Sequence, residues 1–208
     1  MAGVEELLAP GAFDSIEAAV RDAERTTTGE IVPVVVERSD SYADVRIGAA
    51  ALVAIAGGGL LAAFAPQLDP WLVPTQIGVF AALCAGFGWR PLLGAVAPNP
   101  LFSERVHQAA ALAFHHAGLV ETRERTGILI YVSLLERRVE VVADKGIHAR
   151  VADGTWEEVV ERVLAGIRAG RADQGLVAGI RRCGEILAAN FPPRADDLNE
   201  LPDRPRGA

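Results

Sequence analysis

Two long runs of the sequence carry no charged side chain, and they constrain the fold more than any other feature. The first is Ile47 to Gln67, whose apolar part of about 20 residues is long enough to cross a hydrocarbon core of about 30 Å. The second extends from Trp71 to Trp89, and a tryptophan at each end can bury its ring while its N–H stays hydrated. The pattern predicts a transmembrane helical hairpin over residues 46–97.

The alternative is a pair of buried helices inside a soluble core. The chain has 208 residues. The roughly 150 residues outside the hairpin are too few to enclose two entirely apolar helices of this length. A mean hydropathy of +0.24, high for a soluble protein, agrees with the membrane interpretation. We therefore expect a lipid bilayer to be one partner of this chain.

Arginines flank the hairpin and predict its orientation. Arg38 and Arg46 precede the first run, Arg90 and Arg105 follow the second, and the connector around Asp69 has none. By the positive-inside rule, both soluble parts are expected to be cytoplasmic, in a multi-pass protein of a bacterial inner membrane. The acidic first 25 residues do not resemble a cleaved signal peptide.

Small residues recur at every fourth position in both runs and predict a packing face. Such stripes let helix backbones approach closely in a membrane, where no hydrophobic effect drives association. The partner is either the other helix of the hairpin or a second copy of the chain, which would give a homo-oligomer. The stripes are Ala50, Ala54, Gly58 and Ala62 in the first run, and Gly78, Ala82 and Gly86 in the second.

The segment before the hairpin, residues 1–45, is expected to hold one helix and one strand. Residues 13–26 place apolar side chains at helical spacing after Asp14 and Ser15, which suit an N-terminal cap. Residues 30–37 are a β-branched run typical of a buried strand, in which Pro33 favours a sheet edge or a bulge.

The segment after the hairpin, residues 98–190, is expected to hold three helices and a β-hairpin. The strand patterns are residues 127–134 and 139–143, separated by a short polar turn. Residues 191–208 are rich in proline and poor in apolar side chains, which predicts an extended tail. The residues that suit the helix ends are Ser103, Gly118, Thr155 with Glu158, and Asp173.

The block from Thr126 to Ile147, TGILIYVSLLERRVEVVADKGI, carries a family resemblance together with the upstream AERTTTGEIVPVV and a later NELPD. These segments resemble the TPM-domain family, in particular its bacterial membrane branch, in which a transmembrane hairpin interrupts the domain. The resemblance implies an α/β fold, a small α/β/α sandwich around a mixed sheet that the strand before the hairpin completes. It also implies the divalent-cation binding and weak phosphatase activity of some members.

Three carboxylates at expected strand and helix ends suggest a cation site. Glu30 begins the first strand, Asp144 follows the β-hairpin, and Asp153 precedes the tryptophan helix. Ligands bind at strand ends of open α/β sheets, and carboxylate oxygens suit Ca²⁺ or Mg²⁺. In the alternative, Glu30 and Asp153 cap or hydrate loops, while Asp144 pairs with Lys145 or an arginine.

The histidines and cysteines suggest no further chemistry. His107 and His115 are eight positions apart on one expected helix, too far for one zinc ion, so surface positions are expected for them and for His116 and His148. Cys183 falls at an inward helix position and is expected to be a buried, inert thiol.

The leading functional hypothesis is an interaction or accessory module for other membrane or envelope proteins. A net charge of −7 argues against nucleic-acid binding, and the sequence holds none of the catalytic signatures with a defined mechanism. The alternative is a weak phosphatase, in which Glu30, Asp144 and Asp153 hold the cation that polarises a phosphoryl oxygen.

Overall fold

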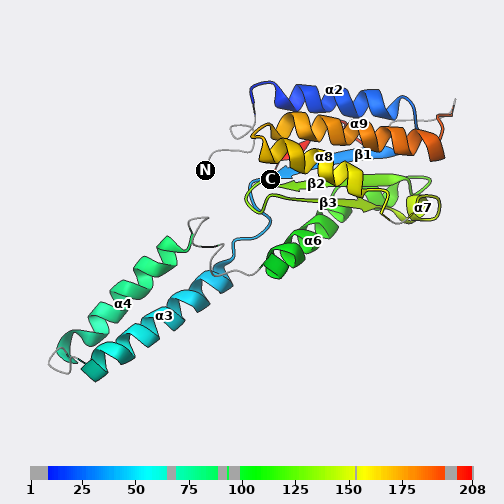
Figure 1. Ribbon diagram of the computed structural model, residues 1–208. Coiled ribbons are helices and arrows are strands. Elements are labelled where there is room, and N and C mark those ends of the chain that lie inside the picture. The colour runs from blue at the N-terminus through cyan, green and yellow to red at the C-terminus, as the bar shows by residue number, and fades with distance from the viewer. Residues whose placement is uncertain are drawn as a thin grey trace. The chain divides into compact units, whose positions relative to one another are not determined.

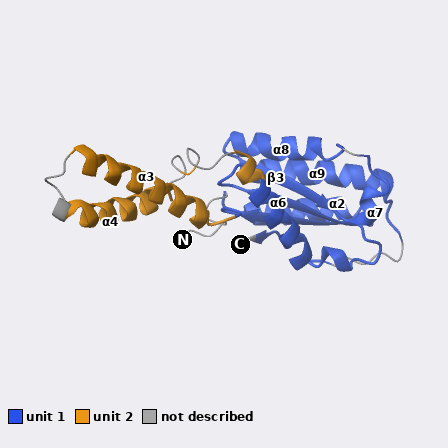
Figure 2. Cartoon of the chain, turned by 90° about the horizontal axis from the view of Figure 1, so that it is seen from below, with its two compact units in different colours: residues 1–39, 104–208 blue, residues 40–103 orange. Residues whose placement is uncertain are grey.

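The computed structural model describes residues 9–64, 69–88, 93, 99–152, 154–194 and 201–207. Within them the chain is a mixed α/β protein with seven α-helices and one sheet. It divides into two compact units, one of residues 1–39 and 104–208 and one of residues 40–103 (Figures 1 and 2). We call them the α/β unit and the helical unit.

The sheet of the α/β unit has three long strands and one short strand. They are β1 (Glu30–Val36), β2 (Gly127–Ser133), β3 (Arg138–Ala143) and β4 (Arg206–Gly207). Their order is β3-β2-β1-β4. β2 is parallel to β1 and antiparallel to β3, and β4 is parallel to β1. The sheet is therefore mixed, as expected, and the β-hairpin of β2 and β3 is confirmed.

Strand β1 joins the sheet across the whole intervening helical unit. It pairs with β2 from Glu30 opposite Gly127 to Val36 opposite Ser133, and all of its residues are buried. The N–H of Glu30 donates to the Thr126 carbonyl, whereas that of Ile31 donates to the Glu24 carboxylate. The N–H groups of successive strand residues point to opposite sides of the strand, so those of residues 31 and 33 point the same way, away from β2. Pro33, which has no N–H, therefore removes no hydrogen bond to β2.

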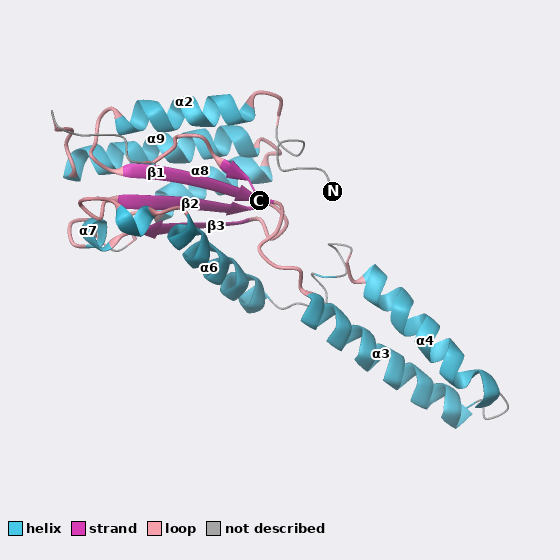
Figure 3. Ribbon diagram, turned by 180° about the vertical axis from the view of Figure 1, so that it is seen from behind, coloured by secondary structure: helices cyan, strands magenta, loops and turns pink. Residues whose placement is uncertain are grey.

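Helices cover both faces of this sheet (Figures 1 and 3). One face packs against α2 (Ala12–Glu24), α8 (Glu157–Arg168) and α9 (Ala172–Asn190). The other packs against α6 (Asn99–His116) and the short η2 (Leu119–Glu121). Side chains of successive strand residues point to opposite faces, so each strand contributes to both apolar cores.

Helices α8 and α9 approach closely where both lack a side chain. A Cβ at Gly166 would lie 2.4 Å from the Cα of Gly175, and one at Gly175 would lie 2.7 Å from the Cα of Gly166. Farther along, Arg182 of α9 donates to Glu158 of α8. The two helices therefore pack closely together in one layer over the sheet.

The expected helix starts were wrong, although the helices themselves are present. α2 begins after Gly11, which has a φ of 78°, instead of at Asp14 or Ser15. α6 begins at Asn99 instead of Ser103. The Thr155 hydroxyl donates to the Ala152 carbonyl and caps no helix. In each case the helix begins at another residue than expected, so the polar side chain does not lie at the cap position.

The start of α9 (Ala172–Asn190) differs from the prediction, whereas the end of α6 (Asn99–His116) agrees with it. The residue before α9 is Arg171, and Asp173 lies inside its first turn instead of capping it. Gly118 has a φ of 78° directly after α6, so its expected role in ending that helix is confirmed.

The helical unit contains α3 (Ala43–Phe64) and α4 (Asp69–Gly86). They pack against each other in opposite directions, since Arg46 contacts Cys84 and Gln76 contacts Ala54. The first small-residue stripe is confirmed as a packing face at Ala50, Ala54 and Gly58, which are buried, whereas Ala62 is exposed. On α4, Gly78 and Ala82 are exposed, so the second stripe does not face α3.

Among the described residues, one helix is long and apolar enough to cross a membrane. It is α3, whose most apolar 18-residue window has a mean hydropathy of 2.1 and is 17% buried. The apolar part of α4, Trp71–Gly86, is shorter. It is shorter than the expected run because the helix ends at Gly86, ahead of Trp89, which lies outside the described residues.

The pairing of β1 with β2 predicts that Val35→Asp destabilises the whole α/β unit. Val35 is 1% exposed and lies in the core beneath α2 and α9, where an unpaired charge costs about 3–5 kcal/mol. Limited proteolysis of the full chain should show residues 103–190 becoming sensitive. Leu112→Asp, at a side chain that is 57% exposed, is the matched control. Unchanged resistance in the Val35 variant would contradict a single unit built from both segments.

Candidate functional site

Two of the three predicted cation ligands lie at the same edge of the sheet. Glu30 is opposite Gly127 at the start of β1, and the N–H of Asp144 donates to the Gly127 carbonyl at 2.9 Å. The two carboxylates therefore flank Gly127 on either side. This is the amino edge of the parallel strands β1 and β2, whereas α/β sheets bind ligands at the carboxyl edge. The general rule about strand ends therefore does not support this site.

The carboxylate of Asp144 already has a structural role. It caps α7 (Lys145–His148), accepting the backbone N–H of Lys145 at 2.7 Å. Its second oxygen lies 3.7 Å from the guanidinium of Arg125. Asp144 is only 5% exposed, and although the capping bond and the nearby guanidinium offset part of its lost hydration, its Oδ2 accepts no hydrogen bond within the described residues.

An apolar side chain packs against the residue that separates Glu30 from Asp144 in the sheet. Glu30 and Asp144 are two strand spacings apart, or about 10 Å between their Cα atoms. The place that a side chain of Gly127 would take is filled by Leu119, whose Cδ2 lies 2.7 Å from the ideal Cβ position. Leu119 is fully buried. It therefore packs against Gly127, the residue that lies between Glu30 and Asp144 in the sheet.

The third predicted ligand, Asp153, lies outside the described residues. In the part of the chain that the structure does describe, no three His, Cys, Asp or Glu residues come together in a way that could hold a metal ion. His107 lies in α6 and contacts Glu140 of β3 at 2.8 Å. Cys183 is fully buried, and burial raises the pKa of its thiol, which agrees with the expected inert thiol.

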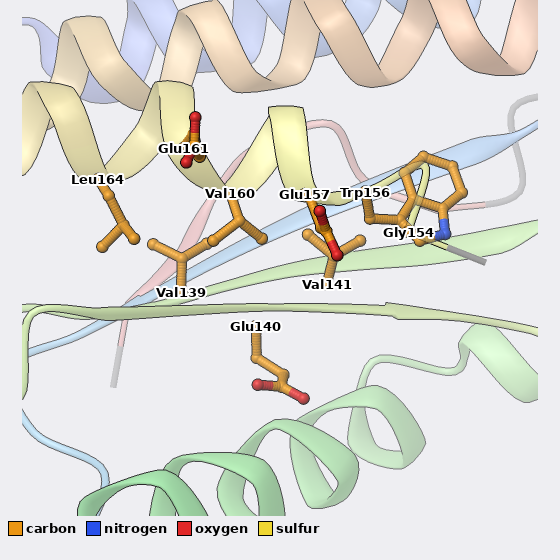
Figure 4. Close-up of a pocket in the computed structure, with 9 residues that line it drawn as sticks. All are labelled: Val139, Glu140, Val141, Gly154, Trp156, Glu157, Val160, Glu161 and Leu164. Carbon is orange, nitrogen blue, oxygen red and sulfur yellow. The ribbon is translucent and has the colours of Figure 1, made fainter. Parts of the chain in front are cut away.

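A groove between β3 and α8 was not predicted from the sequence. It has a volume of about 440 Å³. Figure 4 shows Val139 and Val141 pointing from the strand toward α8, Val160 and Leu164 pointing from the helix toward the strand, and Glu140 on the opposite side of the strand. The residues that line it are Val139, Glu140, Val141, Gly154, Trp156, Glu157, Val160, Glu161 and Leu164.

The strand side of the groove is an open sheet edge. Within the described residues, β3 pairs only with β2. Since Asp144 donates to Gly127, alternation along the antiparallel pair directs the backbone groups of Glu140 and Val142 toward β2. Those of Val139 and Val141 point outward. Side chains of these same two residues face α8, so the groove and the free backbone groups lie side by side.

The helix side of the groove carries two carboxylates without a basic partner. Glu157 and Glu161 are exposed, and neither side chain makes an ion pair or hydrogen bond within the described residues. Glu158, between them in sequence, differs: hydrogen bonds from Arg162 and Arg182 lower the pKa of its carboxyl. Across the strand, the hydrogen bond with Glu140 raises the pKa of His107. Glu157 and Glu161 are thus the uncommitted charges of the groove.

A melting experiment tests the cation site directly. A ligand that binds the native state stabilises it by RT ln(1 + [L]/Kd), so a shared ion would raise the melting temperature of the wild-type chain. We expect at most a weak response to millimolar Ca²⁺ or Mg²⁺, because two carboxylates supply few of the roughly six to eight oxygens that Ca²⁺ needs.

Variants of Glu30 and Asp144 test whether a rise in melting temperature with Ca²⁺ or Mg²⁺ depends on these two carboxylates. Glu30→Gln and Asp144→Asn should abolish it, whereas Asp22→Asn, at an exposed carboxylate of α2, should not. A response that survives in both site variants would place the cation elsewhere, and no response in the wild type would remove the site.

Comparisons with known proteins cover both parts of the split unit. Residues 96–186 match the family model of the TPM domain. They include α6, β2, β3 and α8, whereas β1 lies outside the match. The chain is also similar to an NMR structure of the BA42 protein from the psychrophilic bacterium Bizionia argentinensis, with 24% identity, a TM-score of 0.62 and 99% of each chain covered. No curated protein matches. The chain thus shares the fold of the BA42 protein, and its residues 96–186 match the TPM domain family.

Proposed function

We propose that this protein is anchored in a bacterial inner membrane by α3 and α4, and that its α/β unit is an interaction or accessory module for membrane or envelope proteins. The observation that carries the proposal is α3, a helix of 22 residues whose apolar window is 17% buried. A helix of that length extends about 33 Å, enough to cross a hydrocarbon core of about 30 Å.

The distribution of exposed apolar side chains supports the anchor. Among the described residues, every large hydrophobic side chain that is exposed lies on α3 or α4, with the exception of Leu112. Leu52 is 72% exposed, Ile55 69% and Phe64 80%. Soluble monomers rarely expose contiguous apolar surface of this extent. Lipid would cover these side chains and remove their contact with water.

Hydrogen bonds between α3 and α4 support the anchor. Arg46 Nη2 donates to the Cys84 carbonyl at 2.7 Å, near the start of α3 and the end of α4. Gln76 Nε2 donates to the Ala54 carbonyl at 3.4 Å, and only a glycine at position 58 leaves room for its side chain. Polar side chains inside a membrane are expected to bond to neighbouring helices. In the proposal α4 is the second, shorter span.

The outer face of α4 extends the proposal to self-association. Gly78 and Ala82 are exposed and face away from α3. A second copy could pack against them closely in the membrane, where small residues favour helix contacts. The homo-oligomer is therefore proposed through α4, since the stripe of α3 is already covered.

The interaction module is preferred to the divalent-cation-dependent phosphatase for two reasons. Leu119 occupies the place that a side chain of Gly127 would take, next to Glu30 and Asp144 in the sheet, and Asp144 is used to cap α7. In contrast, the β3 edge combines backbone groups that pair with no other described strand with an apolar groove. These are the features by which protein segments are recognised at sheet edges.

Charges on the exposed face of α3 test the anchor. Leu52→Asp with Ile55→Asp should move the chain out of the alkali-resistant membrane fraction, because each central charge costs about 2.5–3.5 kcal/mol on insertion scales. In water the same double variant would be harmless, since both side chains are largely exposed. Leu112→Asp on α6 is the control and should stay in the membrane. Recovery of the wild-type chain in the soluble fraction would reject the anchor.

Cysteine labelling tests the orientation. In intact cells, Asp69→Cys at the start of α4 should react with an impermeant maleimide from the periplasm, because the flanking arginines remain inside. Asp22→Cys should react only after lysis. Asp22 is 72% exposed in the α/β unit, so protection cannot come from burial. The parent chain is the control for Cys84 and Cys183. Labelling of position 22 with protection of position 69 would reverse the proposed topology.

A further inference from the structure

We propose that the groove between β3 and α8 binds an extended, positively charged segment of a partner protein, which adds to the sheet as a strand beside β3. The inference deepens the proposed interaction function and names the surface and the chemistry of the partner. It is carried by three features that meet at one place: an open strand edge, an apolar groove and two uncommitted carboxylates.

The open edge supplies the main-chain contacts. The outward N–H and C=O groups of Val139 and Val141 are not used by β2, as the register of the hairpin requires. Exposed backbone groups of an edge strand pair readily with another strand. β3 has six residues, so it can pair with a segment of about six residues.

The groove supplies side-chain pockets at the spacing of a strand. In an added strand, every second side chain points to the α8 side of the sheet. Those side chains would meet Val139 and Val141 on the strand and Trp156, Val160 and Leu164 on the helix side. A partner segment is therefore expected to place apolar residues at alternate positions.

The carboxylates determine the charge of the partner. The only ionisable side chains that line the groove in the described chain are Glu140, Glu157 and Glu161, and no Lys, Arg or His lines it. Glu140 points to the other side of the strand and contacts His107 (Figure 4). Glu157 and Glu161 remain to attract Lys or Arg residues of the segment, and charge complementarity of this kind selects partners and speeds their association.

The same charges disfavour binding of a second copy of this chain at the β3 edge. A twofold contact between two β3 edges would place the same surface on both sides. It would bring Glu157 and Glu161 of one copy toward the same residues of the other, and like charges in a contact reduce its stability. A basic segment of another protein satisfies both the edge and the carboxylates.

Designed peptides test the proposal on the full-length chain in a nonionic detergent. The probe is a blocked, fluorescently labelled hexapeptide of alternating valine and lysine, and the comparison peptide replaces each lysine by glutamate. Fluorescence anisotropy should show saturable binding of the lysine peptide and much weaker binding of the glutamate peptide. Two further lysine peptides carry N-methyl groups on the backbone of either the odd-numbered or the even-numbered residues. One of these two peptides should lose binding, because only one of the two sets of N–H groups faces β3.

Charge reversal of the groove provides the decisive variant. Glu157→Lys with Glu161→Lys should weaken binding of the lysine peptide at least about tenfold and strengthen binding of the glutamate peptide. Both positions are exposed, so the fold should persist, which a melting curve checks. The matched control is Asp22→Lys with Glu185→Lys, which makes the same change of net charge at exposed carboxylates of α2 and α9. It should leave both affinities unchanged.

Several results would overturn the proposal. They are the absence of saturable binding by the wild-type chain, equal binding of the two peptides, or insensitivity to the groove reversal. A wild-type dimer in sedimentation that Val141→Pro dissociates would assign the edge to a second copy and would also overturn it. Because peptide binding is measured in detergent, it does not depend on membrane insertion. If the peptide does not bind but the wild-type chain is found in the membrane fraction, the groove proposal alone is rejected. If the peptide binds but the wild-type chain is found in the soluble fraction, the anchor alone is rejected.

Discussion

The parallel pairing of β1 with β2 is the interaction on which the rest of the α/β unit depends. The two strands pair without a bulge from Glu30 to Val36, although the whole helical unit separates them in sequence. This pairing places Val35 in the core beneath α2 and α9, and Val34 in the core above α6. It also leaves β3 at the opposite edge of the sheet. Both apolar cores and the open edge therefore follow from one strand contributed by the first segment.

Carboxylates in this protein differ in function according to what surrounds them. Asp144 is buried and is used within the fold, where it caps α7 and faces Arg125. Glu158 is exposed but joins α8 to α9 through Arg182. Glu157 and Glu161 are on the same helix as Glu158, yet they form no ion pair within the described residues. Residues of one type thus stabilise the fold at some positions and stay available for recognition at others.

The strands could be predicted from the sequence because their signals are local and strong. Residues 30–36, 127–133 and 138–143 are rich in β-branched side chains, and a short polar turn links the last two. Helix starts were predicted less well, since Asp14, Ser103, Thr155 and Asp173 resemble caps while the helices begin elsewhere. β4 has only two residues, too few for a pattern. The groove could not be predicted, because it requires knowing that β3 is an edge strand and that α8 lies beside it.

The position of β1 also has a consequence for the order of folding during synthesis. Its two neighbours in the sheet, β2 and β4, both come later in the chain, and β4 lies at residues 206–207. Contacts between residues far apart in sequence form slowly, because a long loop must first be closed. A ribosome therefore makes β1 and the apolar helices well before any strand can pair with β1. During that interval the β-branched segment stays without a sheet, and α3 is complete before the α/β unit can fold.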